Sequence, residues 1–223
     1  PWLERLGRGR RLVRYDCRGT GMSGPECGPL SLGAFVDDLG AVADAAGLER
    51  FDIFAASQSA AVAFVYAARN PGRVRRIVSY GGWPQGSAMR DEAGSESMAE
   101  ALGTMLRLGW GQPEGGYMRA FTGLFLPGAD EDRIAAFVDL QSASATPERA
   151  VEIRDVISRF DVTDRLADVA APVLVAHARG DNLHPFAQAQ MQVRHLPDAQ
   201  LLPLDSRNHI LQPDEPAFDA LME

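Results

Sequence analysis

A serine, an aspartate and a histidine occur in that order along the chain, each just after an apolar stretch typical of a β-strand: Ser57, Asp181 and His209. A serine hydroxyl is a poor nucleophile at neutral pH, so it needs an imidazole that removes its proton during attack and later protonates the leaving group. A carboxylate fixes the tautomer of that imidazole. The three residue types therefore predict nucleophilic catalysis, with Ser57 as the nucleophile, His209 as the base and Asp181 as the acid.

The surroundings of Ser57 favour a sharp turn between a strand and a helix. The apolar run 51–54 precedes the serine, and the segment 60–68, which is apolar on every face, follows it as a buried helix. Strand and helix nearly touch at such a turn, so the flanking residues must be small. They are Ala55, Ala56, Ser59 and Ala60.

This stretch resembles the nucleophile elbow of the α/β-hydrolase superfamily, with small residues in place of both glycines of the Gly-x-Ser-x-Gly pattern. The continuation over 66–71 and 74–78 is similar to the helix end and next strand of these enzymes, and its register selects Ser57 over Ser59. The order of nucleophile, acid and histidine also agrees with the superfamily. In such enzymes the backbone N–H after the nucleophile belongs to the oxyanion hole, which implies that role for Gln58.

Three short segments, 56–59, 179–181 and 204–209, resemble more specifically a bacterial group of α/β-hydrolase-like domains. Members of that group are often attached to transcription-regulator or adenylate-cyclase modules. The resemblance implies a mostly parallel sheet flanked by helices, with the core formed by 1–83 and 165–223. The intervening residues 84–164 have helical periodicity and are expected to form a cap over the serine. Candidate pocket walls are Trp83, Trp110, Tyr117, Phe121 and Phe125.

The beginning of the chain departs from the superfamily pattern. The run 11–16 and the loop 16–24 resemble the fourth strand and its Asp-x-Arg-Gly-x-Gly-x-Ser turn, so three earlier strands are unaccounted for. We therefore expect the sequence to be the carboxyl-terminal part of a longer chain. The loop after the third strand would supply the second oxyanion donor, and losing one such donor typically costs about a hundredfold to a thousandfold in turnover.

Two alternative assignments compete with this site. His177, Asp181 and His184 could be mistaken for a metal cluster, but a zinc site needs further ligands and a supporting shell, so we expect no metal and no other cofactor. Asp91 is an alternative acid, placed after the strand that follows the serine, but it lies in a polar stretch, 87–97. Asp181 is the favoured acid.

The composition is that of a globular enzyme: 223 residues, 46% hydrophobic and 23% charged. A net charge of −8 argues against binding nucleic acid, and no apolar run is long enough to cross a bilayer. Cys17 and Cys27 are too few for a disulfide framework, and no signal peptide is visible, which together favour the cytoplasm. The expected partner is a small acyl substrate, and the resemblance also allows a fused regulatory domain or a homodimer.

The sequence thus predicts a serine hydrolase that cleaves a small ester, lactone or related acyl substrate through an acyl-enzyme. The alternative is a ligand-sensing domain of a regulatory protein, with slow turnover or none. No residue in the sequence chooses among esters, lactones, amides and carbon–carbon cleavage substrates.

Overall fold

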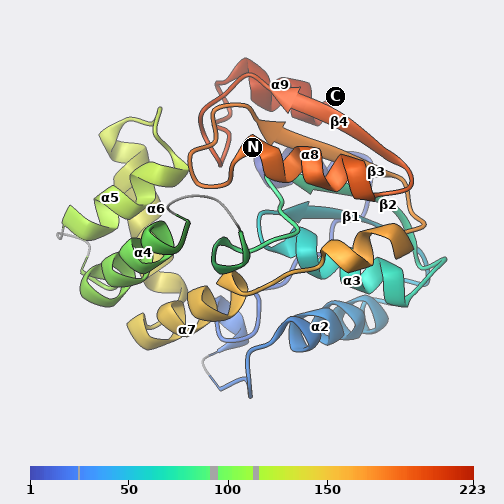
Figure 1. The fold of residues 1–223 in the computed structure, drawn as a ribbon, viewed down its shortest axis with the longest axis horizontal. Helices are drawn as coiled ribbons and strands as arrows, with labels where there is room; N and C mark the ends of the chain where they lie inside the picture. Colours follow the sequence, from blue (N-terminus) through green and yellow to red (C-terminus); the bar gives the residue numbers. More distant parts are fainter. Residues whose placement is uncertain (25, 91–94, 113–115) are drawn as a thin grey trace.

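A parallel four-stranded sheet forms the centre of the protein in the computed structural model, which describes residues 1–24, 26–90, 95–112 and 116–223 (Figure 1). The strands are β1 (Phe51–Ala56), β2 (Val74–Tyr80), β3 (Val173–Ala178) and β4 (Ala199–Leu204), in the order β1-β2-β3-β4. All neighbouring pairs are parallel. The carboxyl ends of all four strands therefore meet at one edge, where α/β sheets bind their ligands.

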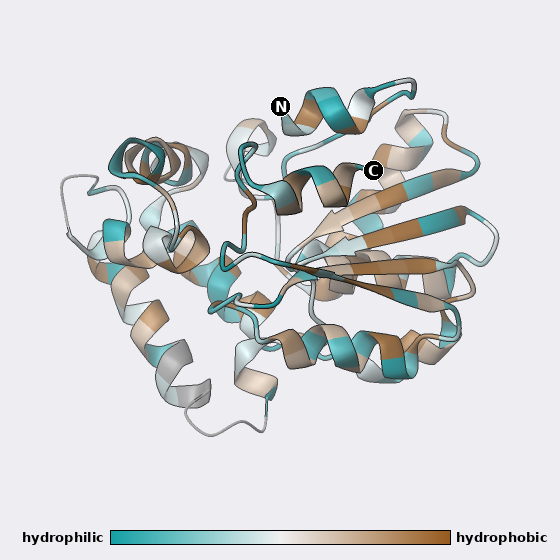
Figure 2. Cartoon of the chain, turned by 90° about the horizontal axis from the view of Figure 1, so that it is seen from above, coloured by the Kyte–Doolittle hydropathy of each residue, from teal (hydrophilic) through white to brown (hydrophobic). Residues whose placement is uncertain are grey.

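Helices cover both faces of the sheet, as the alternation of strands and helices predicts. On one face lie α2 (Leu32–Ala45), α3 (Ser59–Arg69) and α8 (Phe186–His195), and on the other lie α1 (Trp2–Gly7) and α9 (Pro216–Met222). Figure 2 shows the strands between these two layers. Short 3₁₀ helices occur at Gly21–Ser23, Ser87–Met89 and Thr163–Asp168.

The two faces of the sheet have separate apolar cores, because successive side chains of a strand point to opposite sides. Ala55 and Ile77 pack under α3, whereas Phe54 and Tyr80 face α1 and α9. Every residue of α3 from Ala60 to Ala67 is buried, which confirms the prediction of an internal helix. This helix and β1 hold the turn between them in a fixed position.

Two local features of the sequence account for where α2 begins and ends. The Ser31 hydroxyl accepts a hydrogen bond from the Ala34 N–H at 3.1 Å, the usual contact of a serine N-cap. Gly47, just past the helix, has a φ of +66°, a conformation that glycine adopts at little cost. A serine before the first helical residue and a glycine after the last are usual signals for the two ends of a helix.

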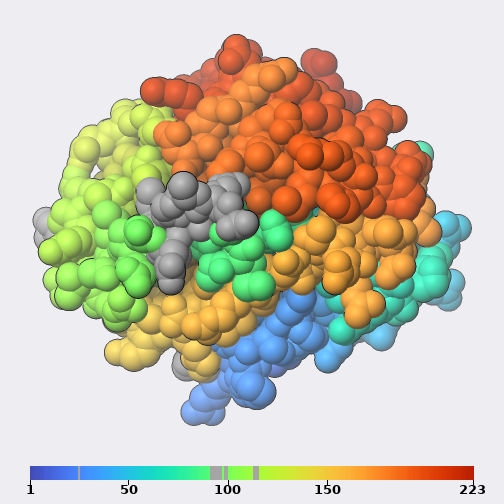
Figure 3. Space-filling view, viewed as in Figure 1, coloured from blue at the N-terminus to red at the C-terminus, as the bar shows by residue number. Residues whose placement is uncertain are grey.

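Four further helices form a separate layer beside the sheet: α4 (Ser95–Gly109), α5 (Gly116–Phe125), α6 (Glu131–Ser144) and α7 (Pro147–Ser158). Their inward faces share an apolar cluster that includes Leu106, Met118 and Val138. In the space-filling view of Figure 3 this helical layer lies directly against the carboxyl-terminal part of the chain. No strand is assigned in the described residues of this segment.

The chain enters and leaves the helical layer through two paired backbone segments. The Val162 N–H donates to the Pro84 carbonyl at 2.9 Å, and the Gly86 N–H donates to the Phe160 carbonyl at 2.7 Å. Gln85 and Asp161 form an isolated antiparallel bridge between them. The two ends of the helical segment are therefore fastened to each other where they meet the core.

The expected strand at 11–16 is wrong. These residues adopt no regular secondary structure, and Leu12, Val13 and Tyr15 are 40%, 36% and 38% exposed. A strand needs a neighbour that accepts and donates its ladder of backbone hydrogen bonds. Within the described residues, β1 pairs only with β2, and 11–16 has no such neighbour.

Among the residues that the structure describes, no helix has the length and apolar character needed to cross a bilayer.

Candidate active site

Ser57 occupies the turn between β1 and α3 with a φ of +56°. Within the described part of the chain it is the one residue other than glycine with positive φ. Left-handed backbone costs an L-residue about 1 to 2 kcal/mol, so the surrounding packing must hold the turn. The Ser57 N–H donates to the Tyr80 carbonyl at 2.9 Å, which fixes the turn to the end of β2.

Small residues are required around this turn. A Cβ added at Gly82 would lie 2.4 Å from the Cβ of Ala60 and 3.6 Å from the carbonyl oxygen of Ser57. Gln58, the next residue, is the N-cap of α3 and has helical dihedral angles. Its N–H belongs to the amides that a helix leaves without an internal acceptor. That amide is available to a bound oxygen.

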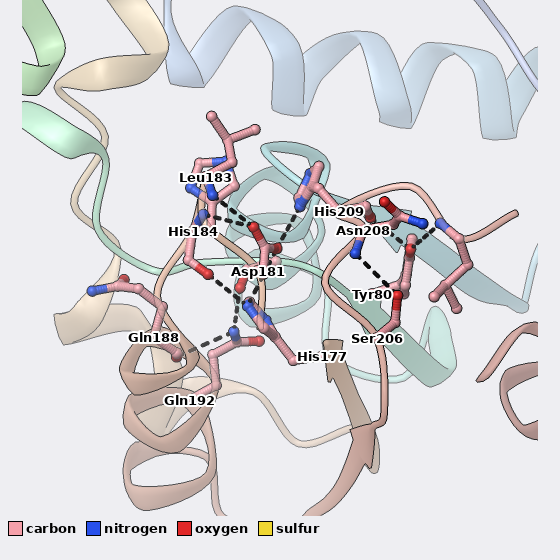
Figure 4. Close-up of polar contacts among 12 residues, drawn as sticks. Tyr80, His177, Asp181, Leu183, His184, Gln188, Gln192, Ser206, Asn208 and His209 are labelled. Atoms are coloured by element: carbon pink, nitrogen blue, oxygen red, sulfur yellow. Dashed lines mark hydrogen bonds and ion pairs between the residues drawn. The ribbon is translucent and has the colours of Figure 1, made fainter. Parts of the chain in front are cut away.

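Asp181 and His209, which follow β3 and β4, are in direct contact. The Nδ1 atom of His209 lies 2.7 Å from Oδ2 of Asp181, and both side chains are buried (Figure 4). Because a carboxylate only accepts, Nδ1 carries the proton and Nε2 is left as the basic nitrogen. Burial alone would raise the pKa of Asp181, but the hydrogen bond and charge of His209 lower it below its usual value.

The turn after β3 presents the carboxylate of Asp181 in a fixed orientation. Its Oδ1 accepts hydrogen bonds from the backbone N–H groups of Leu183 at 2.8 Å and His184 at 3.0 Å. Nε2 of His177 donates to the His184 carbonyl at 2.9 Å and lies 3.6 Å from Oδ2 of Asp181. Every oxygen of the carboxylate is therefore engaged, and Oδ2 is left aimed at His209.

The loop that carries His209 is tied to β2 by Tyr80. The Tyr80 hydroxyl donates to the His209 carbonyl at 2.6 Å and accepts from the Leu211 N–H at 2.9 Å. Tyr80 is 4% exposed, and burial raises the pKa of its hydroxyl, so it remains a donor. A Cβ added at the next residue, Gly81, would lie 2.9 Å from Cε1 of His209. Tyr80 thus contacts both the serine turn and the histidine loop.

Glu215 fastens the same loop from the other side. Its carboxylate accepts hydrogen bonds from the Ser206 hydroxyl at 2.5 Å, the Asn208 side chain at 2.8 Å and the Gln212 N–H at 2.6 Å. Asn208 also accepts from the Gly128 N–H at 2.9 Å, at the turn that follows α5. The His209 N–H donates to the carbonyl of Phe125, the last residue of α5, at 2.8 Å. The loop therefore touches the helical layer as well as the sheet.

A cavity of about 250 Å³ lies between the serine turn and the helical layer. The core contributes Thr20, Ser57, Gln58, Trp83, Leu183 and His184 to its lining. Helices α4 to α7 contribute Leu102, Leu106, Phe121, Phe125, Gln141, Ser144, Ala150, Ile153, Arg154 and Ile157, while Trp110 follows α4 and Ala145 follows α6. This mixture of apolar walls and a few polar groups is typical of a small-ligand site.

The aromatic residues proposed as pocket walls fall into two groups. Trp83, Trp110, Phe121 and Phe125 line the cavity. Tyr117 does not: half of it is exposed, and its Cβ lies against the Gly109 position on α4. Tyr117 immediately precedes the buried Met118, so the face of α5 that turns Met118 inward directs Tyr117 toward solvent.

His184 is a cavity residue that the sequence did not single out for this role. Nη2 of Arg90 lies 2.9 Å from its Nδ1, and because arginine only donates, Nδ1 accepts and Nε2 carries the proton. Burial lowers the pKa of His184 well below its usual value, and the nearby charges of His209 and Arg90 act in the same direction. The ring centroids of His184 and His209 are 5.0 Å apart.

Of the three residues predicted to act together, the structure joins Asp181 and His209 by a hydrogen bond. Ser57 is joined to neither by a hydrogen bond, but it lies at the same edge of the sheet and lines the cavity. Phe125 and His184, which also line the cavity, contact the His209 ring at centroid distances of 5.7 and 5.0 Å. His209 therefore lies directly behind two residues of the cavity wall.

The sequence analysis also considered a metal cluster and an alternative acid, Asp91. Among the described residues, no group of three His, Cys, Asp or Glu side chains is arranged to hold a metal ion. His177 is instead a fully buried residue of β3, and burial lowers its pKa. Asp91, the alternative acid, lies outside the described residues.

Tyr80 and Arg154 were also missed by the sequence analysis. Tyr80 is the final residue of β2, and the signal that could have found it is a polar-tipped aromatic residue at the carboxyl end of a central strand. Arg154 interrupts the apolar face formed by Ala150, Ile153 and Ile157 on α7. A charged residue at a position where the helical repeat places side chains toward the interior is a signal that could have identified Arg154.

Comparison with known proteins identifies the family of the chain. The model of the alpha/beta hydrolase fold family matches residues 1–216. The "Putative carbamate hydrolase RutD" of Azorhizobium caulinodans is 25% identical over 214 residues, covering 94% of this chain and 78% of that protein. The pyrrolizixenacetamide deacetylase of Xenorhabdus hominickii is 25% identical over 210 residues, covering 92% and 76% of the two chains.

Solved structures share the fold. An esterase from Exiguobacterium antarcticum superimposes with a TM-score of 0.84 at 17% identity, covering 98% of this chain and 81% of that chain. At this identity the likeness concerns the fold alone. The family model nevertheless spans almost the whole sequence, and the chain is an enzyme of the alpha/beta hydrolase fold family.

Proposed function

We propose that this enzyme is a serine hydrolase that cleaves a small ester, lactone or related acyl compound through an acyl-enzyme formed on Ser57. One observation carries the proposal: a buried Asp181–His209 pair with a 2.7 Å hydrogen bond lies at the same sheet edge as a serine with a φ of +56°. A strained serine that lines a cavity has its hydroxyl presented to a ligand.

In the proposed reaction, the Ser57 hydroxyl attacks the carbonyl carbon while Nε2 of His209 accepts its proton. The ionised Asp181 holds the proton on Nδ1 and stabilises the imidazolium. The backbone N–H of Gln58 donates to the oxygen on which negative charge develops. The imidazolium then protonates the leaving group. Water, activated by the same histidine, hydrolyses the acyl-enzyme and regenerates Ser57.

The helical segment 84–164 serves as a cap in this proposal. Its helices supply more than half of the residues that line the cavity, whereas the core supplies Ser57 and Gln58. Substrate must therefore bind between the cap and the sheet edge. The apolar rings of Trp110 and Phe121 would exclude water from the acyl group, which strengthens every electrostatic interaction with the developing charge.

The names of the relatives support chemistry at an acyl carbon. One is called a carbamate hydrolase and another a deacetylase, and a solved structure of the same fold is called an esterase. Each name describes a bond between a carbonyl carbon and oxygen or nitrogen. A serine nucleophile suits all three.

The test is covalent labelling together with turnover. A fluorophosphonate probe should label Ser57, identified by mass spectrometry, and the protein should hydrolyse p-nitrophenyl butyrate. Ser57→Ala should abolish both, and His209→Ala should lower kcat by at least about a thousandfold. Ser59→Ala is the matched control, because the Ser59 hydroxyl donates to the Ala56 carbonyl at 2.6 Å and has no part in the reaction.

Two outcomes would contradict the proposal. One is labelling that persists in Ser57→Ala and disappears in Ser59→Ala. The other is ligand binding in the cavity with neither labelling nor turnover, which is the behaviour of a ligand-sensing domain.

A further inference from the structure

The cavity beside Ser57 is positively charged in a protein that is strongly acidic. The whole chain has a net charge of −8 and 30 acidic residues. None of the described residues that line the cavity is an aspartate or a glutamate, and one of them is Arg154. The described lining of the cavity therefore holds a positive charge, Arg154, without a negative charge, and this arrangement requires an explanation.

Arg154 projects from α7 into this cavity along with Ala150, Ile153 and Ile157. Its Nη2 donates to the Ser87 hydroxyl at 3.2 Å. Its Nε and Nη1 groups have no hydrogen-bond acceptor among the described residues, and Arg154 takes part in none of the ion pairs found there. Most of the donors of this guanidinium are thus unused.

Arg18 is a second partly buried arginine, and its contacts are those of an arginine with a structural role. Arg18 donates to both carboxylate oxygens of Asp38 at 2.6 Å. It also reaches three backbone carbonyls, including those of Cys27 and Ala34. Arg18 therefore satisfies its charge and its donors internally, and Arg154 does not.

The surroundings of Arg154 disfavour its charge unless an anion is bound. Burial lowers the pKa of Arg154, and among the described residues the one carboxylate that opposes this effect is Asp155, an exposed neighbour in the chain. The guanidinium nevertheless stays protonated, because the ordinary pKa of an arginine lies far above neutral pH. Arg90 adds a second positive charge behind His184. Burying an unpaired charge is costly, and a ligand carboxylate would offset that cost.

We propose that Arg154 binds a carboxylate of the substrate, so that the enzyme acts on small acyl compounds that carry one carboxylate in addition to the bond that is cleaved. The inference rests on the function proposed above. Ser57 and Gln58 lie on the core wall of the cavity and Arg154 lies on the α7 wall, so one molecule can contact both. The planar guanidinium matches a carboxylate with two parallel hydrogen bonds. A volume of about 250 Å³ restricts the substrate to a short chain.

The test compares two esters of nearly the same shape, monomethyl succinate and methyl levulinate. The first ends in a carboxylate and the second ends in a neutral methyl ketone. Hydrolysis is followed by proton release in a pH-stat, and the selectivity is the ratio of the two kcat/KM values. We expect the wild-type enzyme to prefer monomethyl succinate, and Arg154→Met to lower the selectivity by at least about tenfold.

Two further variants separate charge from packing. Arg154→Lys keeps the positive charge but loses the planar guanidinium that forms two parallel hydrogen bonds, so it should retain part of the selectivity. Arg159→Met removes a positive charge just past the end of α7, where the side chain is exposed and outside the cavity. It should retain the wild-type selectivity. Equal kcat/KM values for the two esters in the wild type, or an Arg154→Met selectivity within about twofold of wild type, would overturn the proposal.

Binding measurements keep this inference separate from the proposed function. Monomethyl succinate is titrated calorimetrically into Ser57→Ala and into the double variant Ser57→Ala/Arg154→Met. If fluorophosphonate labelling and hydrolysis of p-nitrophenyl butyrate both fail, the proposed function is refuted, but a Kd at least about tenfold higher in the double variant still supports the Arg154 site. Equal affinities, or no binding to Ser57→Ala, refute the Arg154 site whatever the turnover.

Discussion

Removing one oxygen atom from Tyr80 should destabilise the protein and misplace His209, the base in the proposed mechanism. In Tyr80→Phe the ring and its packing against Trp2 and Phe54 are kept, with centroid distances of 5.3 and 6.1 Å in the wild type. The hydroxyl is lost, and with it the hydrogen bonds to the His209 carbonyl and from the Leu211 N–H. The perturbation is therefore confined to two backbone groups at the ends of one short loop.

The size of the effect follows from what these two groups lose. His209 is 4% exposed and Leu211 is fully buried, so water cannot replace the missing partner. A buried polar group left without a partner costs about 1 to 3 kcal/mol. Allowing for some relaxation of the loop, we expect the free energy of unfolding to fall by about 2 to 4 kcal/mol. For a chain of this size that corresponds to a decrease in Tm of about 5 to 15 °C.

The measurement is urea unfolding followed by circular dichroism, with turnover of p-nitrophenyl butyrate on the same samples. Because the displaced residue, His209, is the proposed base and not a residue of the cavity wall, kcat should fall about tenfold or more with little change in KM. Tyr117→Phe is the matched control, since Tyr117 is half exposed and its hydroxyl has no hydrogen-bond partner among the described residues. A loss of less than about 0.5 kcal/mol in Tyr80→Phe would refute this account of the loop.

Three other perturbations test separate parts of the fold. Ser57→Gly should raise the free energy of unfolding by about 1 kcal/mol while abolishing turnover, because glycine adopts positive φ without strain. The pKa values of His177 and His184 are below 6.5 in the folded protein, so stability should be full above pH 6.5 and fall by up to about 1.4 kcal/mol per histidine per pH unit below it. Gly82→Ala should cost about 2 kcal/mol or more, because its Cβ would meet that of Ala60 at 2.4 Å.

Each of these is measured by chemical unfolding, and each has its own contrary result. A Ser57→Gly variant that is less stable than Ser57→Ala would mean that the turn is not strained. Stability that does not change between pH 7 and pH 5 would contradict the neutral state of the two buried histidines. The control for Gly82→Ala is Gly72→Ala, where φ is +90° but no atom lies within 4 Å of the added Cβ. Equal decreases in the free energy of unfolding of the two variants would contradict the steric explanation for Gly82→Ala.

The central fold could be predicted because its signals are local. An apolar run that ends in small residues and a serine, followed by an apolar helix that stops at Pro71, specifies β1, the turn and α3 without long-range information. Asp181 and His209 were selected in the same way, each just after an apolar strand, and their roles as acid and base stay a prediction. Their contact follows from the parallel order of β3 and β4, which brings the two loops to one edge.

The failures have a common physical origin in long-range partners. The run 11–16 has the composition of a strand, but strand formation depends on a neighbouring chain segment, which local sequence does not reveal. Tyr117 was chosen because it is aromatic, whereas its direction depends on which face of α5 meets the other helices. The role of Tyr80 depends on contacts with residues about 130 positions away, which no local pattern records.

The attachment of the His209 loop to the end of α5 has a consequence for how substrate is admitted. The Phe125 carbonyl accepts from the N–H groups of His209 at 2.8 Å and of Ile210 at 3.3 Å, and Asn208 accepts from Gly128 at 2.9 Å. Any motion that lifts α5 from the sheet to let a molecule in must break these bonds and release the imidazole from its position. In the proposed mechanism, His209 can then accept the Ser57 proton only after α5 has closed over the bound molecule, so esters too bulky to allow this closure would bind without being cleaved.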